Sequence, residues 1–362
     1  MFALILSLPS CKLTRFAVFN FANINDYKKF PRRDISREGE AFQFTDGSSQ
    51  SFPDSLTVTK KGNSVHLSFE EYLEKNRSVA FLVIRNDTML YEKYFKGYDR
   101  ASIVASFSMA KSVTSLLIGC AIDDGYIKSI EEPVTNYLPQ LEANGFGKIT
   151  IKDVLNMMSG IDFRESYISP FGNAATYYYG RQLRKQVFKM KLINEPGSEF
   201  SYSSGDTELL GLILESALNG RTISSYLEEK IWKPLGMEYD ASWSIDKKKN
   251  GIEKTFCCIN ARARDFAKIG RLMLNGGSWN GKQIVSRDWV ENSTRIDTTG
   301  GSKWYYQYQW WIRTRHSYSA RGYRGQFIYV NNEKNMIIVR LGKDHGPYGD
   351  WPGFFDFLAK NL

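Results

Sequence analysis

A mostly apolar run that contains a single lysine constrains the fold of this 362-residue chain more than any other feature. From Ser108 to Ile122, large apolar side chains recur at helical spacing, and most other positions are small. A helix that is apolar on most sides must be covered on most sides. The sequence therefore predicts a central helix that stops near Gly125 and places Lys111 inside the protein.

Strand patterns lie on both sides of this helix along the chain. The runs 79–85 and 89–95 are separated by three residues and predict a hairpin. Further strands are expected over 306–312, 326–330 and 336–341, before a closing helix that starts near residue 351. Short turns between the last strands require antiparallel pairing. We therefore expect an α/β (α+β) fold, in which a largely antiparallel sheet is flanked by helices and carries an all-helical insertion domain.

The order of these patterns also predicts a domain organisation. Residues 66–125 and 251–362 are expected to form the sheet domain, and 126–250 the mainly helical insertion. Residues 12–65 are polar and rich in turn residues, which indicates an irregular N-terminal lead-in. Helices after the central one are expected over 150–158, 174–191, 206–218, 223–232 and 261–274.

Composition excludes several classes of protein. Hydrophobic residues make up 42% and charged residues 24%, which is the ordinary globular range, and no apolar run is long enough to span a bilayer. The chain has a net charge of +9 and few clusters of basic residues. It contains no zinc-finger spacing and no RNA-binding signature. We therefore expect no nucleic-acid partner. Three scattered histidines offer few ligands, so no metal site is predicted.

The N-terminal cysteine suggests export. Cys11 follows a short apolar stretch that ends in a small residue, and residues 1–11 resemble a bacterial lipoprotein signal whose cysteine is acylated. This pattern predicts the bacterial cell envelope, in the periplasm, with membrane attachment through a lipidated Cys11. No Lys or Arg precedes the stretch, so a frayed end of a cytoplasmic protein is the alternative. Cys257 and Cys258 are adjacent, which disfavours a bridge between them, and Cys120 is expected to be buried.

The start of the central helix can carry nucleophilic chemistry. Residues three apart on a helix lie about 5–6 Å apart at Cβ, so Lys111 can approach the Ser108 hydroxyl. Burial lowers the pKa of a lysine, and a neutral amine can act as a base. The helix start also favours developing negative charge beside Ser108. A serine that only caps the helix is the alternative. Ser244 and Lys247 share this spacing but lie in a polar stretch.

Two further segments can contribute to the same site. Tyr202 lies in a compact polar loop before the helix expected from residue 206, and a tyrosine beside a cation can act as a base or a proton relay. The alternative is a capping loop with a packed aromatic ring. Residues 321–330 form a glycine-flanked segment that leads into a strand, where a substrate can approach the backbone closely. A backbone N–H there could complete an oxyanion hole with that of Ser108. A bulge or a turn is the alternative.

The order of these three elements resembles a known family. Ser108-x-x-Lys111, then Tyr202-x-Ser204, then a glycine-containing edge strand at 323–326 is similar to the penicillin-recognising serine hydrolases, which comprise β-lactamases, penicillin-binding peptidases and related esterases. Further stretches resemble the class C branch of this β-lactamase/penicillin-binding protein-like superfamily, and especially the 6-aminohexanoate-dimer hydrolase-like carboxylesterases. These stretches are Leu155–Asp162, Tyr202–Gly211 and Ala263–Gly277. The resemblance covers roughly residues 75–362.

The resemblance implies an acyl-enzyme mechanism without a cofactor or metal. Ser108 would be the acylated nucleophile, and Lys111 and Tyr202 would activate it and pass its proton to the leaving group. The backbone N–H groups of Ser108 and Gln326 would form the oxyanion hole. The residues implied in substrate binding are Ser204, Tyr323, Arg324 and Gly325.

Two departures from the family pattern bear on the substrate. Tyr323-Arg324-Gly325 stands where β-lactamases and D-Ala-D-Ala peptidases have Lys-Thr-Gly, so a cation is missing at its first position. Ser204 stands where class C enzymes have Asn. We therefore expect hydrolysis of small carboxylic esters or amides. A β-lactamase or D-Ala-D-Ala carboxypeptidase is one alternative, and a catalytically inactive envelope binding or sensing module is another. The sequence does not indicate the oligomeric state.

Overall fold

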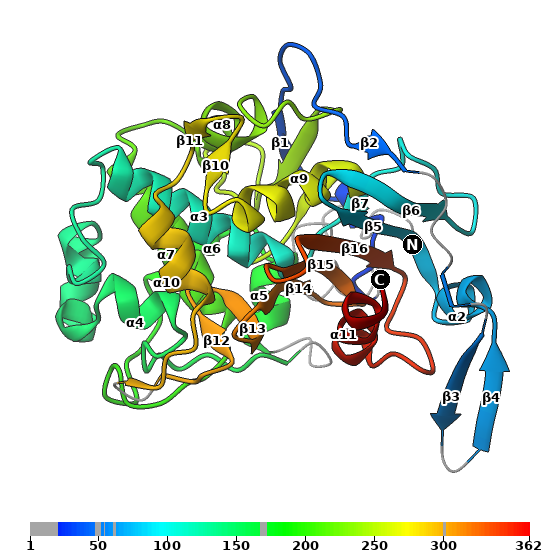
Figure 1. The fold of residues 1–362 in the computed structure, drawn as a ribbon. Helices are drawn as coiled ribbons and strands as arrows, with labels where there is room; N and C mark the ends of the chain where they lie inside the picture. The colour runs from blue at the N-terminus through cyan, green and yellow to red at the C-terminus, as the bar shows by residue number, and fades with distance from the viewer. Residues whose placement is uncertain (1–20, 48–51, 54, 61–62, 167–171, 300–301) are drawn as a thin grey trace, which may run out of the picture.

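A mixed sheet forms the centre of the molecule. The computed structural model describes residues 21–47, 52–53, 55–60, 63–166, 172–299 and 302–362, so Cys11 lies outside the described residues. The sheet has eight strands in the order β12-β13-β14-β15-β16-β5-β6-β2, and its neighbours pair antiparallel except for β2 with β6 (Figure 1). The predicted fold class is confirmed.

The strands of this sheet come from both ends of the chain. β5 (Ser78–Arg85) and β6 (Thr88–Tyr94) form the predicted hairpin, and β5 pairs with the last strand, β16 (Met336–Gly342). The other strands are β2 (Thr45–Asp46), β12 (Tyr306–Gln307), β13 (Trp310–Thr314), β14 (Ser317–Gly322) and β15 (Gln326–Asn331). The sequence patterns did not predict β14.

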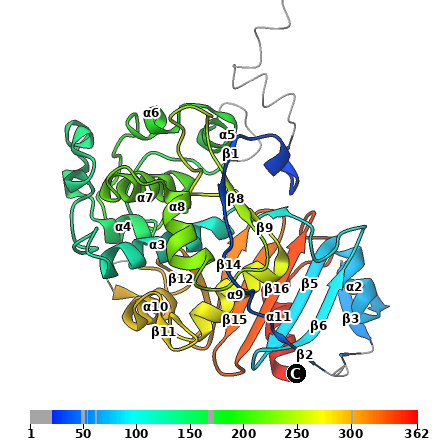
Figure 2. The same cartoon turned by 90° about the horizontal axis from the view of Figure 1, so that it is seen from above.

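The two faces of the sheet bury separate hydrophobic cores. Alternate residues of β5, such as Leu82 and Phe81, face opposite sides, because strand side chains alternate. On one face pack α3 (Met109–Asp123) and α9 (Ala263–Leu274), and on the other α2 (Phe69–Lys75) and α11 (Trp351–Asn361). Figure 2 shows the remaining helices gathered beside α3, away from α2. The central helix predicted from its apolar pattern is α3, and it is buried almost throughout.

Short helices are the main regular structure of the segment between α3 and α9. The helix expected over 174–191 is two helices, α5 (Asn173–Tyr179) and α6 (Leu183–Val187), which are separated at Gly180. α10 follows later in the chain and was not predicted. The remaining α-helices and the π-helical segment are α4 (Ile151–Leu155), α7 (Ser204–Ala217), α8 (Ile223–Leu227), η6 (Glu228–Trp232) and α10 (Arg287–Thr294). The 3-10 turns are η2 (Asp26–Lys28), η3 (Val134–Asn136), η4 (Pro139–Asn144) and η5 (Phe146–Lys148).

The N-terminal lead-in expected to be irregular over 12–65 contains several short strands among its described residues. β1 (Arg32–Ile35) joins a second sheet in the order β1-β8-β9-β7, whose other strands are β7 (Val104–Ala105), β8 (Ala241–Ser244) and β9 (Ile259–Ala261). Two small hairpins complete the strands, β3 (Leu56–Lys60) with β4 (Asn63–Leu67) and β10 (Ser278–Trp279) with β11 (Lys282–Gln283). The partners of β1 lie far along the chain, so no local pattern shows this pairing. β8 also lies inside the segment expected to be helical.

The adjacent cysteines form a bond that the sequence argument disfavoured. Cys257 and Cys258 are joined by a disulfide with their Cα atoms 3.7 Å apart, and Cys258 adopts a φ of +74°. The left-handed backbone at Cys258 brings the two side chains to the same side of the chain. Cys120 is a free, buried cysteine of α3, as expected. Among the described residues, no helix combines the length and apolarity needed to cross a bilayer.

Candidate active site

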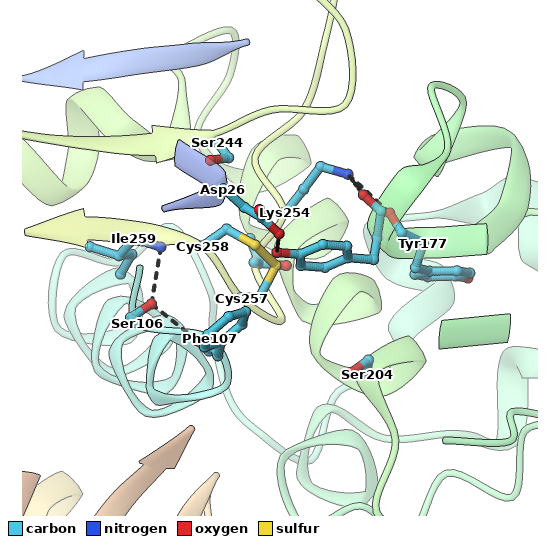
Figure 3. Close-up of a disulfide and its surroundings, with 12 residues drawn as sticks. Asp26, Ser106, Phe107, Tyr177, Ser204, Ser244, Lys254, Cys257, Cys258 and Ile259 are labelled. Carbon is cyan, nitrogen blue, oxygen red and sulfur yellow. Dashed lines mark hydrogen bonds between the residues drawn. A yellow bond between two sulfur atoms is a disulfide. The ribbon is translucent and has the colours of Figure 1, made fainter. Parts of the chain in front are cut away.

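The residues before α3 present Ser108 at a sharp bend. Ser106 is fixed to β9, because its backbone N–H donates to Ile259 O at 2.8 Å and its Oγ accepts from Ile259 N at 3.1 Å (Figure 3). Phe107 then adopts a φ of +46°, which is uncommon for a bulky residue. Ser108 is partly exposed, and within the described part of the chain its side chain makes no capping hydrogen bond to α3. A capping role, which the sequence left open, is therefore not supported.

Lys111 lies one turn further along α3 and is 1% exposed. Its Nζ donates to Ser204 Oγ at 2.9 Å and lies 5.2 Å from the centre of the Tyr202 ring. Burial lowers the pKa of Lys111 to about 8, although the carboxylates of Glu165, Asp206 and Glu208 oppose this shift. A substantial fraction of this amine is therefore neutral near pH 8, which fits a general base.

Tyr202 lies beside both Ser108 and this amine. Burial holds the pKa of Tyr202 above its ordinary value, and a hydrogen bond with the Ser108 side chain opposes the shift. The ring packs against Trp311 and Tyr306, with centroids 5.5 and 6.0 Å away. The phenol is therefore protonated at neutral pH, which favours a proton relay over a resident phenolate base. The structure thus brings Ser108, Lys111 and Tyr202 together.

A glutamate that the sequence did not single out completes the polar side of the site. The backbone N–H and Oγ of Ser204, at the start of α7, both donate to the Glu165 carboxylate at 2.7 Å. Negative charge at a helix start is stabilised by the helix dipole. A hydrogen-bonded chain therefore runs from Lys111 through Ser204 to Glu165. Its members are far apart in sequence, so no motif spacing could have indicated it.

Ser108 lies where two hollows meet. Their empty volumes are about 510 and 810 Å³, including space open to solvent. Ser108 and Tyr323 line both. The first hollow is mainly apolar, and its other lining residues are Phe21, Ala22, Phe107, Ala174, Ala175, Tyr178, Tyr179, Ser204, Phe256 and Cys257. The second is lined further by Tyr202, Trp311, Arg321, Gly322, Phe327, His345, Gly349 and Pro352.

The glycine that allows close approach to the nucleophile is Gly322 at the end of β14. A Cβ at Gly322 would lie 2.3 Å from Ser106 O and 3.3 Å from Met109 N, so a side chain cannot fit there. Gly325, which the sequence argument chose, has a φ of +77° and faces the Arg340 guanidinium instead. A glycine therefore lies beside Ser108, as expected, but it is Gly322 and not Gly325.

The structure does not bring three of the predicted residues to Ser108. The Arg324 guanidinium donates to the backbone carbonyls of Ala22 and Lys343, so its side chain is turned away from the hollows. Gln326 was expected to contribute its backbone N–H; it pairs with Gly322 across β14 and β15, and its buried side chain donates to Gly342 O at 2.7 Å. Among the described residues, the lining of neither hollow includes Arg324, Gly325 or Gln326. The cause is a turn after Tyr323, which carries the chain away from the site.

Arg321 places a positive charge at the end of β14, next to Gly322. Its Nε donates to Ser319 Oγ at 2.9 Å, and its guanidinium lies 5.1 Å from the Trp311 ring centre. Within the described residues no carboxylate lies at ion-pair distance from Arg321, and Asp356 pairs with Arg313 instead. Burial lowers the pKa of Arg321 to about 10, so the group stays charged at neutral pH. Arg321 and Gly322 lie inside the glycine-flanked segment 321–330. They directly precede Tyr323-Arg324-Gly325, the triplet that the sequence comparison had indicated.

Comparisons with known proteins agree with this geometry. The family model described as Beta-lactamase matches residues 68–353. A 6-aminohexanoate-dimer hydrolase of Paenarthrobacter ureafaciens is 30% identical over 294 residues, which cover 75% of this chain and 74% of the relative.

Two solved structures share the fold. A protein assigned as a 6-aminohexanoate-dimer hydrolase of Bacillus anthracis superposes with a TM-score of 0.81 at 24% identity, over 96% of this chain and 94% of the other. A family VIII carboxylesterase superposes with a TM-score of 0.61 at 16% identity, over 79% and 92%. At these identities the likeness shows the fold alone.

Proposed function

Because this chain belongs to the β-lactamase family of serine hydrolases, we propose that it hydrolyses small carboxylic esters or amides through an acyl-enzyme on Ser108. One observation carries the proposal. The Ser108 hydroxyl makes no capping bond within the described residues, and Ser108 lines the second hollow together with Tyr202, whose ring centre lies 5.2 Å from the buried amine of Lys111. This is the arrangement that an activated nucleophile needs.

The geometry supports a two-step reaction. Ser108 Oγ attacks the carbonyl carbon while its proton passes to the Tyr202–Lys111 pair, and Tyr202 returns a proton to the departing alcohol or amine. Water then attacks the acyl group on Ser108 and releases the carboxylic acid. The Ser108 N–H at the start of α3 supports one side of an oxyanion hole. Tyr323, which follows Gly322 beside the nucleophile, is better placed than Gln326 to supply the second donor.

The two hollows suggest which part of a substrate lies where. The leaving group must lie within reach of Tyr202, so it belongs in the second hollow, and the acyl group belongs in the apolar first hollow. Arg321 in the second hollow favours a leaving group that carries a carboxylate. The 6-aminohexanoate dimer, after which the 30% identical relative is named, has such a leaving group. An N-acyl amino acid with an apolar acyl chain therefore fits both hollows.

A substrate panel tests this proposal. We expect kcat/KM for N-butyryl-6-aminohexanoate to exceed kcat/KM for its uncharged primary-amide analogue by about tenfold, the scale of one charged contact. We also expect p-nitrophenyl butyrate to be hydrolysed faster than nitrocefin or a D-Ala-D-Ala peptide. In Arg321→Gln, N-butyryl-6-aminohexanoate should lose this advantage, whereas its uncharged primary-amide analogue should be unaffected. Arg313→Gln, an exposed arginine of the neighbouring strand, is the matched control. Faster turnover of nitrocefin would favour the β-lactamase alternative.

The pH dependence of acylation should report on Lys111. The neutral amine is the base, so kcat/KM for p-nitrophenyl butyrate is expected to rise with pH and to level off above an apparent pKa near 8. Glu165→Gln removes a negative charge that raises the pKa of Lys111, while the amide oxygen can still accept from Ser204. The rising limb should therefore move to lower pH in this variant.

A matched glutamate separates this effect from a general change of charge. Glu199 is exposed on the loop before α7, and Glu199→Gln is expected to leave the pH profile in place. If the rising part of the pH profile of kcat/KM stays at the same pH in Glu165→Gln, or shifts equally in both variants, the coupling between Glu165 and Lys111 is contradicted.

A further inference from the structure

The disulfide between adjacent cysteines forms part of the wall of the apolar hollow. Cys257 lines that hollow together with Ser108, Phe107 and Ser204. Both cysteines are buried, with exposed fractions of 3% and 2%. Figure 3 shows the pair of sulfurs between the bend that carries Phe107 and the strand end at Ile259. Cys257 therefore lies next to the proposed acyl group.

The backbone around the disulfide is held on the side away from the hollow. Cys257 O accepts from the Trp243 indole N–H at 2.8 Å, and Cys258 O accepts from Ser244 N at 3.0 Å. The next residue, Ile259, exchanges hydrogen bonds with Ser106, and Ser106 Oγ donates to Phe107 O at 3.0 Å. Hydrogen bonds therefore fix the backbone at both cysteines and at the residue that follows them, while the side chain of Cys257 lines the hollow.

We propose that Cys257–Cys258 is a redox modification site that sets the width of the acyl hollow, and that a small dithiol reduces it through that hollow. This inference rests on the proposed function. A thiolate of the dithiol attacks Cys257 Sγ, and Cys258 leaves as a thiolate. The second thiol of the reductant then displaces Cys257. Two electrons and two protons pass to the cysteines, and the reductant becomes a disulfide.

Reduction changes the room available to an acyl chain. Two unbonded thiols need more space than a disulfide, and the surrounding interior is close-packed. Cys257 lines the hollow, so open space lies beside it and its thiol can project further into that hollow. Long acyl chains should then be excluded before short ones, because each methylene in a confined pocket affects kcat/KM strongly.

Ester selectivity before and after treatment with dithiothreitol tests the proposal. In the oxidised protein, p-nitrophenyl hexanoate should be preferred over p-nitrophenyl acetate, and reduction should lower the ratio of their kcat/KM values by about tenfold. Cys257→Ala/Cys258→Ala should show a ratio that does not respond to dithiothreitol. Cys120→Ala, a buried cysteine of α3 outside both hollows, is the matched control and should respond like the wild type.

Alkylation provides a readout that does not depend on turnover. Iodoacetamide should modify both Cys257 and Cys258 after mild reduction of the folded protein, and a long-chain alkyl fluorophosphonate on Ser108 should slow this reduction. An unchanged selectivity ratio in protein shown by alkylation to be reduced would overturn the proposal, as would a disulfide that resists dithiothreitol until unfolding. Absence of ester turnover in both redox states would instead contradict the proposed hydrolase itself.

Discussion

Ser108→Ala is expected to lower kcat for p-nitrophenyl butyrate by about 10⁴-fold or more, because it removes the atom that is acylated. Ala fills the same place at the start of α3, and no capping bond within the described residues is lost. The fold should therefore be unaffected. Intact mass after treatment with a fluorophosphonate probe should show one adduct on the wild type and none on the variant. The same spectrum would show whether Cys11 carries lipid.

A second serine provides the control for this experiment. Ser244 has the same spacing to Lys247 that Ser108 has to Lys111, but it lies on β8 and accepts a hydrogen bond from Asn260. Ser244→Ala should keep both activity and labelling. A wild-type protein that never labels would support the inactive binding module instead, and equal labelling of Ser108→Ala would place the nucleophile elsewhere.

Substitution of the two proton-transfer groups should give the next largest loss. Lys111→Met and Tyr202→Phe are each expected to reduce the acylation rate by about 10²-fold or more, the scale of general-base catalysis. Lys111→Arg is the most informative variant, because a guanidinium keeps the positive charge but cannot be deprotonated in a protein. If the neutral amine is the base, Lys111→Arg should be as slow as Lys111→Met.

Stopped-flow measurement of p-nitrophenol release would separate acylation from deacylation in these variants. Tyr305→Phe is the matched control for Tyr202→Phe, since both rings pack near Trp311. Thermal unfolding would show whether the Lys111 variants remain folded with Ser204 and Glu165 left without the amine. A rate near that of the wild type in either position would remove that residue from the mechanism.

The sequence allowed prediction of those site residues that differ clearly from their immediate neighbours along the chain. Lys111 stood out because a charged residue in an apolar helical repeat is costly, and Tyr202 because it lies in a polar loop directly before a helix. Glu165 could not be found in this way, since it acts on Ser204 through a contact between distant segments. The pairing of β1 with β8 was hidden for the same reason.

The glycine-flanked segment 321–330 could be predicted only in part, for a different reason. Two glycines flank Tyr323, and both fit a close approach of the backbone. Only the position of β14, which the sequence patterns did not predict, shows that Gly322 faces the nucleophile and that Arg324 is turned away. The disulfide was missed because the argument from adjacency ignored a left-handed backbone at Cys258.

The pairing of β5 with β16 also determines when the enzyme can become active during its synthesis. Ser108, Lys111 and Tyr202 leave the ribosome well before β14, β15 and β16 exist. Until then β5 has no partner on one edge, and Gly322 and Arg321 have not been made. Contacts between distant segments form late, because a long loop must close first. A growing chain therefore carries Ser108 without the strand that completes the proposed site, and under the proposed mechanism we expect hydrolysis only after the last strand has joined the sheet.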